Sequence, residues 1–357
     1  MTAVKPSDGP IAVTGASGYI GLHAVISLMK RGYTVHACIR DPSNPDKTDP
    51  LKKLNNGDYS GKMELFTANL LEKGSYDKPL EGCAGVLHIA TKWGNPLQVY
   101  EGAVSGTKNV LDSVKKVSSV KRIVFTSTFS AIYHKEKPGY EFTENNWASE
   151  NRENDPRWAL DQITESSDGD IAYSMAKVET EHNSYKTANE DGRFDVITIN
   201  PIAVLGPLLS PVHEGQFSWQ WALGKMLEGQ KCMRQWNALW NCVDVRDVAE
   251  AHVLALESQK VKNGDRFQLS AADNSGIIDS LQLQAHLQIL FPEIKVGGPP
   301  DEIHGIIEKY GKVYQAPIAY CNRAREILGL KPHAIMDTLR ETGQTMIDLN
   351  IIKPALK

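Results

Sequence analysis

The chain has 357 residues, of which 41% are hydrophobic and 23% are charged, and its formal net charge at pH 7 is −4. This length and balance are typical of a globular protein with one large or two modest domains, and they argue against a disordered chain. A small negative charge without a Lys/Arg block gives no long-range attraction to nucleic acid or anionic lipid, so we expect neither as a partner.

Targeting and cysteine patterns predict a cytoplasmic protein. The N-terminal stretch MTAVKPSDGPIAV lacks the features of a signal peptide, and no uncharged apolar segment approaches the ~20 residues of a membrane span. The five cysteines are scattered and form no C-x-x-C pair, which favours reduced thiols over disulfides or a zinc site. The ten histidines show no H-E-x-x-H or similar spacing, so we expect no bound metal.

Short apolar runs alternate with helical patterns through the first two-thirds of the chain. The predicted strands are 10–15, 33–40, 62–70, 84–91, 121–128, 194–201 and 265–271, and the predicted helices are 21–32, 103–117 and one that contains 173–177. Strands that are apolar along most of their length, in alternation with helices, favour a parallel sheet covered on both faces. The predicted fold is therefore a doubly wound α/β domain.

Two stretches interrupt this alternation. Residues 137–170 are acidic and poor in periodicity, and residues 207–240 are rich in tryptophan. We interpret both as long loops, which usually serve a function or move. The acidic segment is either a lid over a site or a solvated insertion. Helical patterns return at 320–330 and 335–349.

Three glycines follow the first predicted strand and begin the first predicted helix. Gly15, Gly18 and Gly21 permit a tight turn and the close approach of a pyrophosphate, which the positive end of the helix stabilises. Their spacing, G-x-x-G-x-x-G, differs from the G-x-G-x-x-G of the common dehydrogenase fingerprint. Such turns also occur without a ligand, but the strand before and the helix after favour dinucleotide binding.

The second predicted strand ends in Arg40, about 20 residues after the glycines. In this fold an acidic residue near that point accepts the ribose 2′-hydroxyl of NAD, whereas an arginine accommodates the 2′-phosphate of NADP. Arg40, with Lys47 in the following loop as a second positive charge, predicts NADP(H) as the cofactor. The alternative is an exposed arginine without a ligand, and the neighbouring Asp41 argues for caution.

Tyr173 and Lys177 share one face of a predicted helix, because they lie four residues apart. A free tyrosine titrates near pH ~10, and a nearby ammonium lowers its pKa by favouring the phenolate. Y-x-x-x-K is common by chance, so the pair alone indicates little. Hydroxyls that could hold a substrate carbonyl beside the tyrosine gather at the end of predicted strand 121–128; they are Thr126, Ser127, Thr128 and Ser130.

Together these motifs resemble the extended short-chain dehydrogenase/reductase family, and within it the dihydroflavonol-reductase-like carbonyl reductases. The resemblance runs over nearly the whole chain, through TGASGYIG, CIRDP, VLHIAT, AVSGTKNVL, VFTST, YSMAK, NPIAVLGP and VDVRDVAEAH. It implies a Rossmann-type doubly wound parallel sheet with a smaller C-terminal α/β substrate domain. The NADP-binding domain would be 8–205 together with about 240–272. The substrate-binding domain would be 206–239 and 273–357.

The resemblance also implies catalytic roles. Tyr173 would donate a proton to the carbonyl oxygen, and Lys177 would bind the nicotinamide ribose and lower the pKa of the tyrosine. The serine that hydrogen-bonds the substrate oxygen in this family is replaced, because its position falls on Thr128. Threonine keeps the hydroxyl donor but adds a methyl group, and Ser127 is the alternative.

A larger set of residues is expected at NADP(H). Asn69 stands where the family usually has an aspartate facing the adenine amine, and its amide oxygen can still accept a hydrogen bond. The cofactor-binding residues that the resemblance implies are Gly15, Ser17, Gly18, Tyr19, Ile20, Gly21, Arg40, Lys47, Asn69, Leu70, Ala90, Thr91, Tyr173, Lys177, Pro201 and Val204. We expect His88 to be a satisfied core histidine and the charged residues of 243–252 to be structural.

Aromatic residues near the predicted site favour a planar or hydrophobic ketone or aldehyde as substrate. The candidate pocket residues are Trp93, Phe129, Tyr133 and Phe217, with Trp219 and Trp221 beside them. Packing in the core is the alternative for each of them. Monomer and homodimer both remain open.

The sequence thus predicts an NADPH-dependent reductase that converts a ketone or aldehyde into an alcohol, with Tyr173 as general acid. Same-family alternatives are a sugar-nucleotide epimerase or dehydratase and a hydroxysteroid-type dehydrogenase. Arg40 argues against the tightly bound NAD of epimerases, and the lack of a membrane segment argues against the steroid enzyme. A non-catalytic NADP-binding sensor is the alternative from another class, and the Tyr173–Lys177 pair argues against it.

Overall fold

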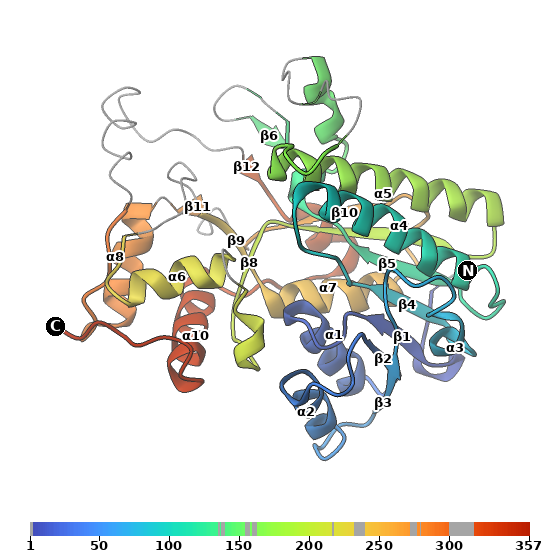
Figure 1. Cartoon of the computed structure of the whole chain (residues 1–357), viewed down its shortest axis with the longest axis horizontal. Coiled ribbons are helices and arrows are strands. Elements are labelled where there is room, and N and C mark those ends of the chain that lie inside the picture. Colours follow the sequence, from blue (N-terminus) through green and yellow to red (C-terminus); the bar gives the residue numbers. More distant parts are fainter. Residues whose placement is uncertain are drawn as a thin grey trace.

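The computed structural model describes residues 3–134, 136, 140–153, 158, 163–215, 218–231, 240–271, 277–278, 280–299 and 318–357. Its larger part is a sheet with helices on both faces. A smaller part, built around α6 (Trp219–Leu227), α8 (Ser280–Leu290) and α10 (Ile335–Asp348), lies beside it (Figure 1).

Seven strands form the main sheet. They are β1 (Ile11–Thr14), β2 (Thr34–Ile39), β3 (Lys62–Thr67), β4 (Gly85–His88), β5 (Arg122–Thr126), β7 (Asp195–Pro201) and β10 (Arg266–Leu269). Their spatial order is β10-β7-β5-β4-β1-β2-β3, and each neighbouring pair is parallel. Each corresponds to one of the predicted strands, so the predicted parallel sheet is confirmed.

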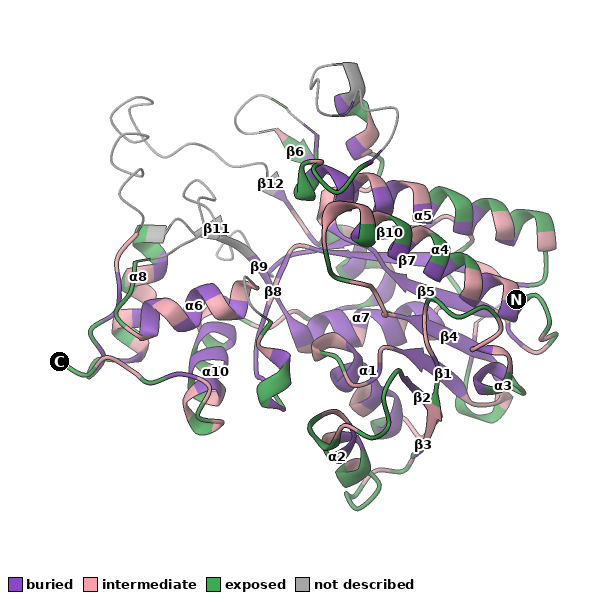
Figure 2. Ribbon diagram, viewed as in Figure 1, coloured by how far each residue is buried: buried purple, intermediate pink, exposed green. Residues whose placement is uncertain are grey.

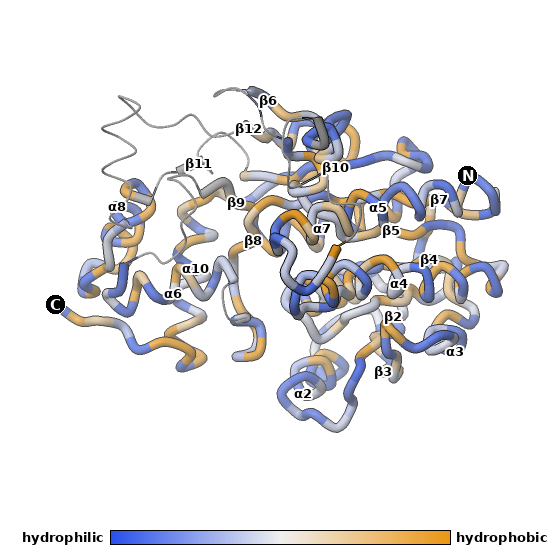
Figure 3. Tube along the Cα trace, turned by 45° about the horizontal axis from the view of Figure 1, so that its top comes forward, coloured by the Kyte–Doolittle hydropathy of each residue, from blue (hydrophilic) through white to orange (hydrophobic). Residues whose placement is uncertain are grey.

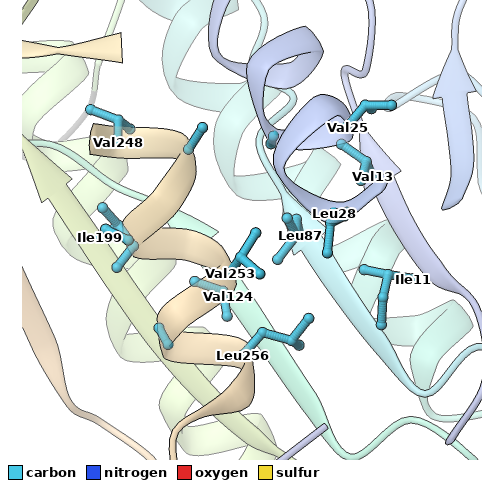
Figure 4. Close-up of a cluster of buried hydrophobic side chains, with 14 of the residues drawn as sticks. Ile11, Val13, Val25, Leu28, Leu87, Val124, Ile199, Val248, Val253 and Leu256 are labelled. Atoms are coloured by element: carbon cyan, nitrogen blue, oxygen red, sulfur yellow. The ribbon is translucent and has the colours of Figure 1, made fainter. Parts of the chain in front are cut away.

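Helices cover both faces of this sheet. On one face lie α1 (Tyr19–Lys30) and α7 (Val245–Glu257), and on the other lie α3 (Asp77–Leu80), α4 (Pro96–Val114) and α5 (Gly169–Asp191). Alternate residues of each strand face opposite layers: Ile11 and Val13 join the α1–α7 core, and Ala12 joins the other. Figure 4 shows side chains of α7 meeting those of the central strands in the first core. The doubly wound α/β fold is confirmed.

Burial follows these layers. Apart from the edge strand β3, the strands of the main sheet are almost wholly buried and α7 is mostly buried, whereas the far end of α5 is exposed on its outer side (Figure 2). Hydrophobic residues run along the central strands, and α2 (Pro45–Leu54), at the β3 edge, is largely hydrophilic (Figure 3). Each fully buried Val, Leu or Ile side chain contributes about 1.5–3 kcal/mol, so the two cores fix the carboxyl edge of the sheet as a rigid platform.

A third, separate apolar core belongs to the smaller part of the molecule. It packs α6 (Trp219–Leu227), α8 (Ser280–Leu290) and α10 (Ile335–Asp348) against the three-stranded sheet of β8 (Ala203–Leu205), β9 (Trp240–Asp244) and β11 (Ile277–Ile278). The charged residues at the start of α7 join the two parts: Arg246 bonds Glu341 at 2.7 Å, and Asp244 accepts from Thr338 at 2.8 Å. The predicted division into an NADP-binding and a substrate-binding domain stays a prediction.

The long loops differ from the expectation. Residues 207–240 contain α6, which the sequence analysis missed, as well as the short helix η5 (Pro211–His213). The Ser218 side chain accepts from the backbone N–H of Trp221 and so caps α6. Within 137–170 lie η3 (Ala148–Glu153) and β6 (Glu141–Phe142), which pairs with β12 (Ile318–Ala319).

The remaining elements are short. They are η1 (Pro6–Asp8), η2 (Phe129–Ala131) and the π-helix η7 (Ala324–Leu328). Among the described helices, none combines the length and apolar character that a membrane crossing requires. The described residues also contain no group of three or more His, Cys, Asp or Glu side chains placed to hold a metal ion.

Candidate active site

The strand order reverses at the carboxyl edge of the main sheet, which is where open α/β sheets form a ligand-binding crevice. From β1 the chain continues to β2 on one side, while β4 pairs with β1 on the other side. In open α/β sheets, ligands bind where the strand order reverses in this way. The glycine turn after β1 and the ends of β4 and β5 therefore border the candidate site.

The glycine turn has no room for side chains. Gly15 has a φ of +68°, and a Cβ there would lie 3.0 Å from the Cα of Ala90. A Cβ on Gly21 would lie 2.1 Å from the backbone oxygen of Gly15. Gly18 is the N-cap of α1, so the free N–H groups of that helix point into the turn. The geometry is that of a phosphate-binding turn.

The other residues of the turn are held from both parts of the molecule. The Tyr19 hydroxyl donates to the backbone oxygen of Gly206 at 2.8 Å, so its side chain points away from the turn. His213 hydrogen-bonds the backbone of Ser17. Ile20 packs against the first core. If these residues contact a dinucleotide, Tyr19 does so through its main chain.

Two cations stand near the end of β2. Arg40 is exposed, and Lys47 on α2 is partly buried. Neither forms an ion pair within the described part of the chain. The Asp41 carboxylate accepts instead from the backbone and hydroxyl of Ser43 at 3.0 and 2.6 Å. Because the Asp41 carboxylate is bonded within its own turn, Asp41 argues less strongly against NADP(H) than the sequence alone suggested.

Residues after β3 shape the far end of the crevice. The amide oxygen of Asn69 accepts from the backbone N–H of Leu71 at 3.2 Å, which uses one of its two lone pairs. Leu70 packs against the core beneath α4. Asn69 thus keeps one acceptor position.

The end of β4 is organised around Thr14. Its hydroxyl oxygen accepts from the backbone N–H groups of Ile89 and Ala90, each at 3.0 Å, and bonds His88 Nδ1 at 2.8 Å. His88 Nε2 bonds Thr107 at 3.0 Å, and burial lowers the pKa of His88 to about 3. His88 is therefore a neutral, satisfied core histidine, as expected.

Thr91, next along the chain, has a different status. Its hydroxyl oxygen is buried and has no hydrogen-bond partner among the described residues. Buried hydroxyls are rarely left unsatisfied in proteins. The orphaned hydroxyl lies two residues beyond Ile89, at the same strand end that borders the glycine turn, and it fits a site for a polar ligand.

Tyr173 and Lys177 lie on α5, one turn apart, and face the end of β5. Lys177 Nζ lies 5.8 Å from the centre of the Tyr173 ring and donates to the backbone oxygen of Thr126 at 2.9 Å. Burial lowers the pKa of Lys177 to about 8. The lysine thus stands beside the tyrosine as expected, as a cation that deprotonates more readily than a free lysine.

The expected lowering of the Tyr173 pKa is not found. Burial raises the pKa of Tyr173 above its ordinary value, and a hydrogen bond with Thr128 opposes this shift only in part. The expectation neglected the loss of water around the phenol, which disfavours the phenolate. Tyr173 is therefore held in its protonated form.

The structure separates the two candidate hydroxyls at the end of β5. Thr128 reaches the Tyr173 hydroxyl. The Ser127 hydroxyl instead donates to the carboxylate of Glu181, eight residues after Tyr173 on α5. Of the two candidates, Thr128 is therefore the one that is hydrogen-bonded to Tyr173.

The candidate pocket residues fall into two groups. Trp93 is 72% exposed, and its ring is stacked on Tyr173 with centroids 5.7 Å apart. Phe129 and Tyr133 instead pack against one another and against Phe142. Phe217 lies outside the described residues. Of the further candidates, Trp219 and Trp221 pack against the apolar core of α6, α8 and α10.

The last two predicted cofactor residues come from β7 and β8. Pro201 is buried at the end of β7, beside the end of β10. Val204 is partly buried in β8 and packs against the first core. Their contact with a cofactor stays a prediction.

Comparison with known proteins agrees with this geometry. A family model described as "NAD dependent epimerase/dehydratase family" matches residues 11–270. The chain belongs to this family. It is an oxidoreductase of the extended short-chain dehydrogenase/reductase type, which confirms the resemblance found in the sequence.

Two curated relatives and one solved structure illustrate the membership. Cinnamoyl-CoA reductase CAD2 from Medicago truncatula is 36% identical over 70% of this chain and 72% of that protein. Dihydroflavonol 4-reductase from Hordeum vulgare is 34% identical over 57% of this chain and 55% of that protein. Yeast methylglyoxal/isovaleraldehyde reductase Gre2, complexed with NADPH, has a TM-score of 0.74 at 22% identity, covering 96% of this chain and 99% of that one. At this identity Gre2 shows a shared fold.

Sequence analysis of this family member missed a buried polar group behind the site. The group consists of Glu181 on α5, Asn200 on β7 and Arg266 on β10; Asn200 and Arg266 each donate a hydrogen bond to the Glu181 carboxylate. One signal was available, because Glu181 continues the four-residue spacing of Tyr173 and Lys177 along α5. The other two gave no local signal.

Proposed function

We propose that the chain is an NADPH-dependent reductase that converts a ketone or aldehyde into an alcohol, with Tyr173 as the general acid. The observation that carries this proposal is the hydrogen bond between Tyr173 and Thr128, at the edge of the sheet and beside Lys177. Two hydroxyl donors that meet at one point can both bond a single carbonyl oxygen.

The residues of the crevice fit a dinucleotide. The glycine turn offers backbone N–H groups at the start of α1 to a pyrophosphate. Thr91 has a buried hydroxyl that lacks a partner among the described residues. Arg40 and Lys47 form no ion pair within the described part of the chain and offer two positive charges to a 2′-phosphate. These features support NADP(H) over NAD(H).

The chain's own residues would perform the proton transfer. When bound, the nicotinamide supplies a hydride to the carbonyl carbon. Tyr173, which burial keeps protonated, donates its proton to the carbonyl oxygen. Thr128 orients that oxygen by a second hydrogen bond, as an oxyanion-hole donor does. Lys177 contributes a positive charge that favours the phenolate left behind.

The substrate class follows from the aromatic wall and from the relatives. Cinnamoyl-CoA reductase and dihydroflavonol 4-reductase are named for aromatic carbonyl compounds. In this chain the large exposed ring of Trp93 lies against Tyr173. A planar aromatic aldehyde or ketone can extend that stack, so we assign this class to the site.

The test is an initial-rate assay on the purified protein. NADPH and NADH are each supplied with a panel of aromatic and aliphatic aldehydes and ketones, for wild type and for Tyr173→Phe. We expect aromatic substrates to be reduced with NADPH in preference to NADH. Loss of the general acid should reduce the rate by about 10²–10⁴-fold. Binding of NADPH without turnover of any carbonyl compound would contradict the proposal and favour a non-catalytic NADP-binding sensor.

A further inference from the structure

A buried acidic residue stands one helical turn beyond Lys177. Tyr173, Lys177, Glu181 and Tyr185 recur at every fourth position of α5 and so lie along one face of the helix. Glu181 is 0% exposed, and its neighbour in this row, Lys177, is 3% exposed. A carboxylate is rarely buried in this way unless it is paired and hydrogen-bonded.

Four donors satisfy the Glu181 carboxylate. One oxygen accepts from the Ser127 hydroxyl and from Asn200 Nδ2, the latter at 2.8 Å. The other accepts from Arg266 Nε at 2.8 Å and from the Tyr185 hydroxyl at 3.2 Å. These contacts give each carboxylate oxygen two hydrogen-bond donors. Glu181 therefore forms a buried ion pair with Arg266, and its other contacts hold the carboxylate in one position.

The same contacts hold the strand end that carries Thr128. Glu181 binds the side chain of Ser127, and Asn200 also donates to the backbone oxygen of Thr128 at 3.1 Å. One residue earlier, the backbone oxygen of Thr126 accepts from Lys177. Three consecutive residues at the end of β5 are thus tied to α5 and β7.

Arg266 extends these ties to the segment that follows. Its guanidinium donates to the backbone oxygen of Ala131, at the end of η2, and to those of Glu144 and Asn146 at 2.8 and 2.7 Å. It also lies over the Trp147 ring, 3.7 Å from the centroid. The Glu181–Arg266 pair therefore fixes both sides of Thr128.

We propose that Glu181 is a positioning residue of the reductase: its carboxylate fixes Thr128 through Ser127 and Asn200, and its charge keeps Lys177 in the ammonium form beside Tyr173. The proposal rests on the proposed function, because Thr128, Tyr173 and Lys177 take their roles from it. Glu181 itself touches no reacting atom.

Glu181 also affects Lys177 through its charge. Burial lowers the pKa of Lys177, and the negative charge of Glu181 opposes this shift. The other titratable groups around the pair are Tyr173, His182 and Tyr185 on α5, His88 on β4, His252 on α7 and Arg266 on β10. Burial keeps His88 and His252 neutral. Without Glu181, Lys177 and Arg266 would be two buried cations, so Lys177 should deprotonate at lower pH.

The test compares Glu181→Gln with a matched control on the same helix, Glu190→Gln, whose carboxylate is exposed and faces Lys186. The pH profile of kcat/KM is measured with NADPH and an aromatic aldehyde, and NADPH binding is followed by fluorescence over the same pH range. In Glu181→Gln the alkaline limb of both profiles should shift to lower pH, by about one pH unit or more. Glu190→Gln should follow wild type, and Glu181→Asp, which keeps the charge, should keep the limb while losing rate.

Folding is checked for each variant by thermal unfolding, since Glu181→Gln leaves Arg266 without its partner. If that variant does not fold, Glu181→Gln combined with Arg266→Gln removes the pair together, which proteins tolerate better than half a pair. The alkaline limb of this double variant should also shift to lower pH, by a smaller amount. A folded variant with the wild-type pH limb and only a lower Tm would overturn the proposal. Should wild type reduce no carbonyl compound, the proposed function fails instead, and the binding profile still tests Glu181.

Discussion

The Trp93 ring is stacked on Tyr173, with planes 17° apart, although 72% of the Trp93 residue is exposed. An exposed tryptophan above the candidate acid offers a flat apolar surface where a substrate ring would approach. Aromatic pairs contribute about 0.5–1.5 kcal/mol beyond simple burial. We therefore propose Trp93 as the residue through which this chain prefers aromatic carbonyl compounds.

Trp93→Ala should lower kcat/KM for aromatic aldehydes by about 2–10-fold and change the value for short aliphatic aldehydes less. Trp93→Phe, which keeps a ring, should retain most of the preference. The measurement is the ratio of kcat/KM for an aromatic and an aliphatic aldehyde in the three proteins. An unchanged ratio in Trp93→Ala would remove Trp93 from the substrate pocket.

Thr128→Val should reduce kcat/KM by about 10²–10³-fold, the usual cost of one oxyanion-hole donor. Valine has nearly the shape of threonine but no hydroxyl, so the loss reports on the hydrogen bond. Thr128→Ser should stay within about tenfold of wild type, because it keeps that donor. If Ser127→Ala proves more damaging than Thr128→Val, the substrate oxygen is bound by Ser127.

Arg40→Ala should weaken NADPH binding by about 10–100-fold, since hydrogen bonds to charged groups contribute about 1.5–3 kcal/mol. NADH, which lacks the 2′-phosphate, should bind as before. Fluorescence titration with both cofactors checks this, and Lys52→Ala on the exposed side of α2 serves as the matched loss of one positive charge. If the substitution weakened the binding of NADPH and NADH equally, Arg40 would not recognise the 2′-phosphate, and the predicted preference for NADP(H) would be wrong.

The activity of wild type should fall as the pH rises through about 8, where Lys177 loses its proton. Below that pH the ammonium remains beside Tyr173, and above it the charge that favours the phenolate is lost. A pH profile of kcat/KM, with NADPH absorbance as the readout, measures this limb. An activity that stays level from pH 7 to pH 10 would show that the reaction does not depend on the charge of Lys177.

The sequence predicted those parts of the fold that depend on local patterns. Apolar runs located each strand of the main sheet, and the spacing of Gly15, Gly18 and Gly21 located the turn, because only glycine fits where a Cβ would meet backbone. The sequence analysis did not predict α6, because a stretch rich in tryptophan suggests a loop. The helix instead buries small and aliphatic residues such as Ala222 and Leu223.

For the site, the sequence indicated the candidate residues but not their side-chain directions or their pKa shifts. The row of Tyr173 and Lys177 is a local pattern, but the choice between Ser127 and Thr128 depends on which way each side chain leaves the strand end. The rise in the Tyr173 pKa depends on burial by distant parts of the chain. The pairing of Glu181 with Arg266 joins residues 85 positions apart, and no spacing in the sequence announces it.

One measurement tests the central claim most directly: the fate of the hydride in a single turnover. Wild type and Tyr173→Phe are mixed with an aromatic aldehyde and NADPH that carries deuterium at the transferred position, and the product is analysed by mass spectrometry. We predict an alcohol with one deuterium on the former carbonyl carbon for wild type, and at least a hundredfold slower formation for Tyr173→Phe. An undeuterated product, or equal rates in the two proteins, would contradict the assignment of Tyr173 as the acid of a carbonyl reductase.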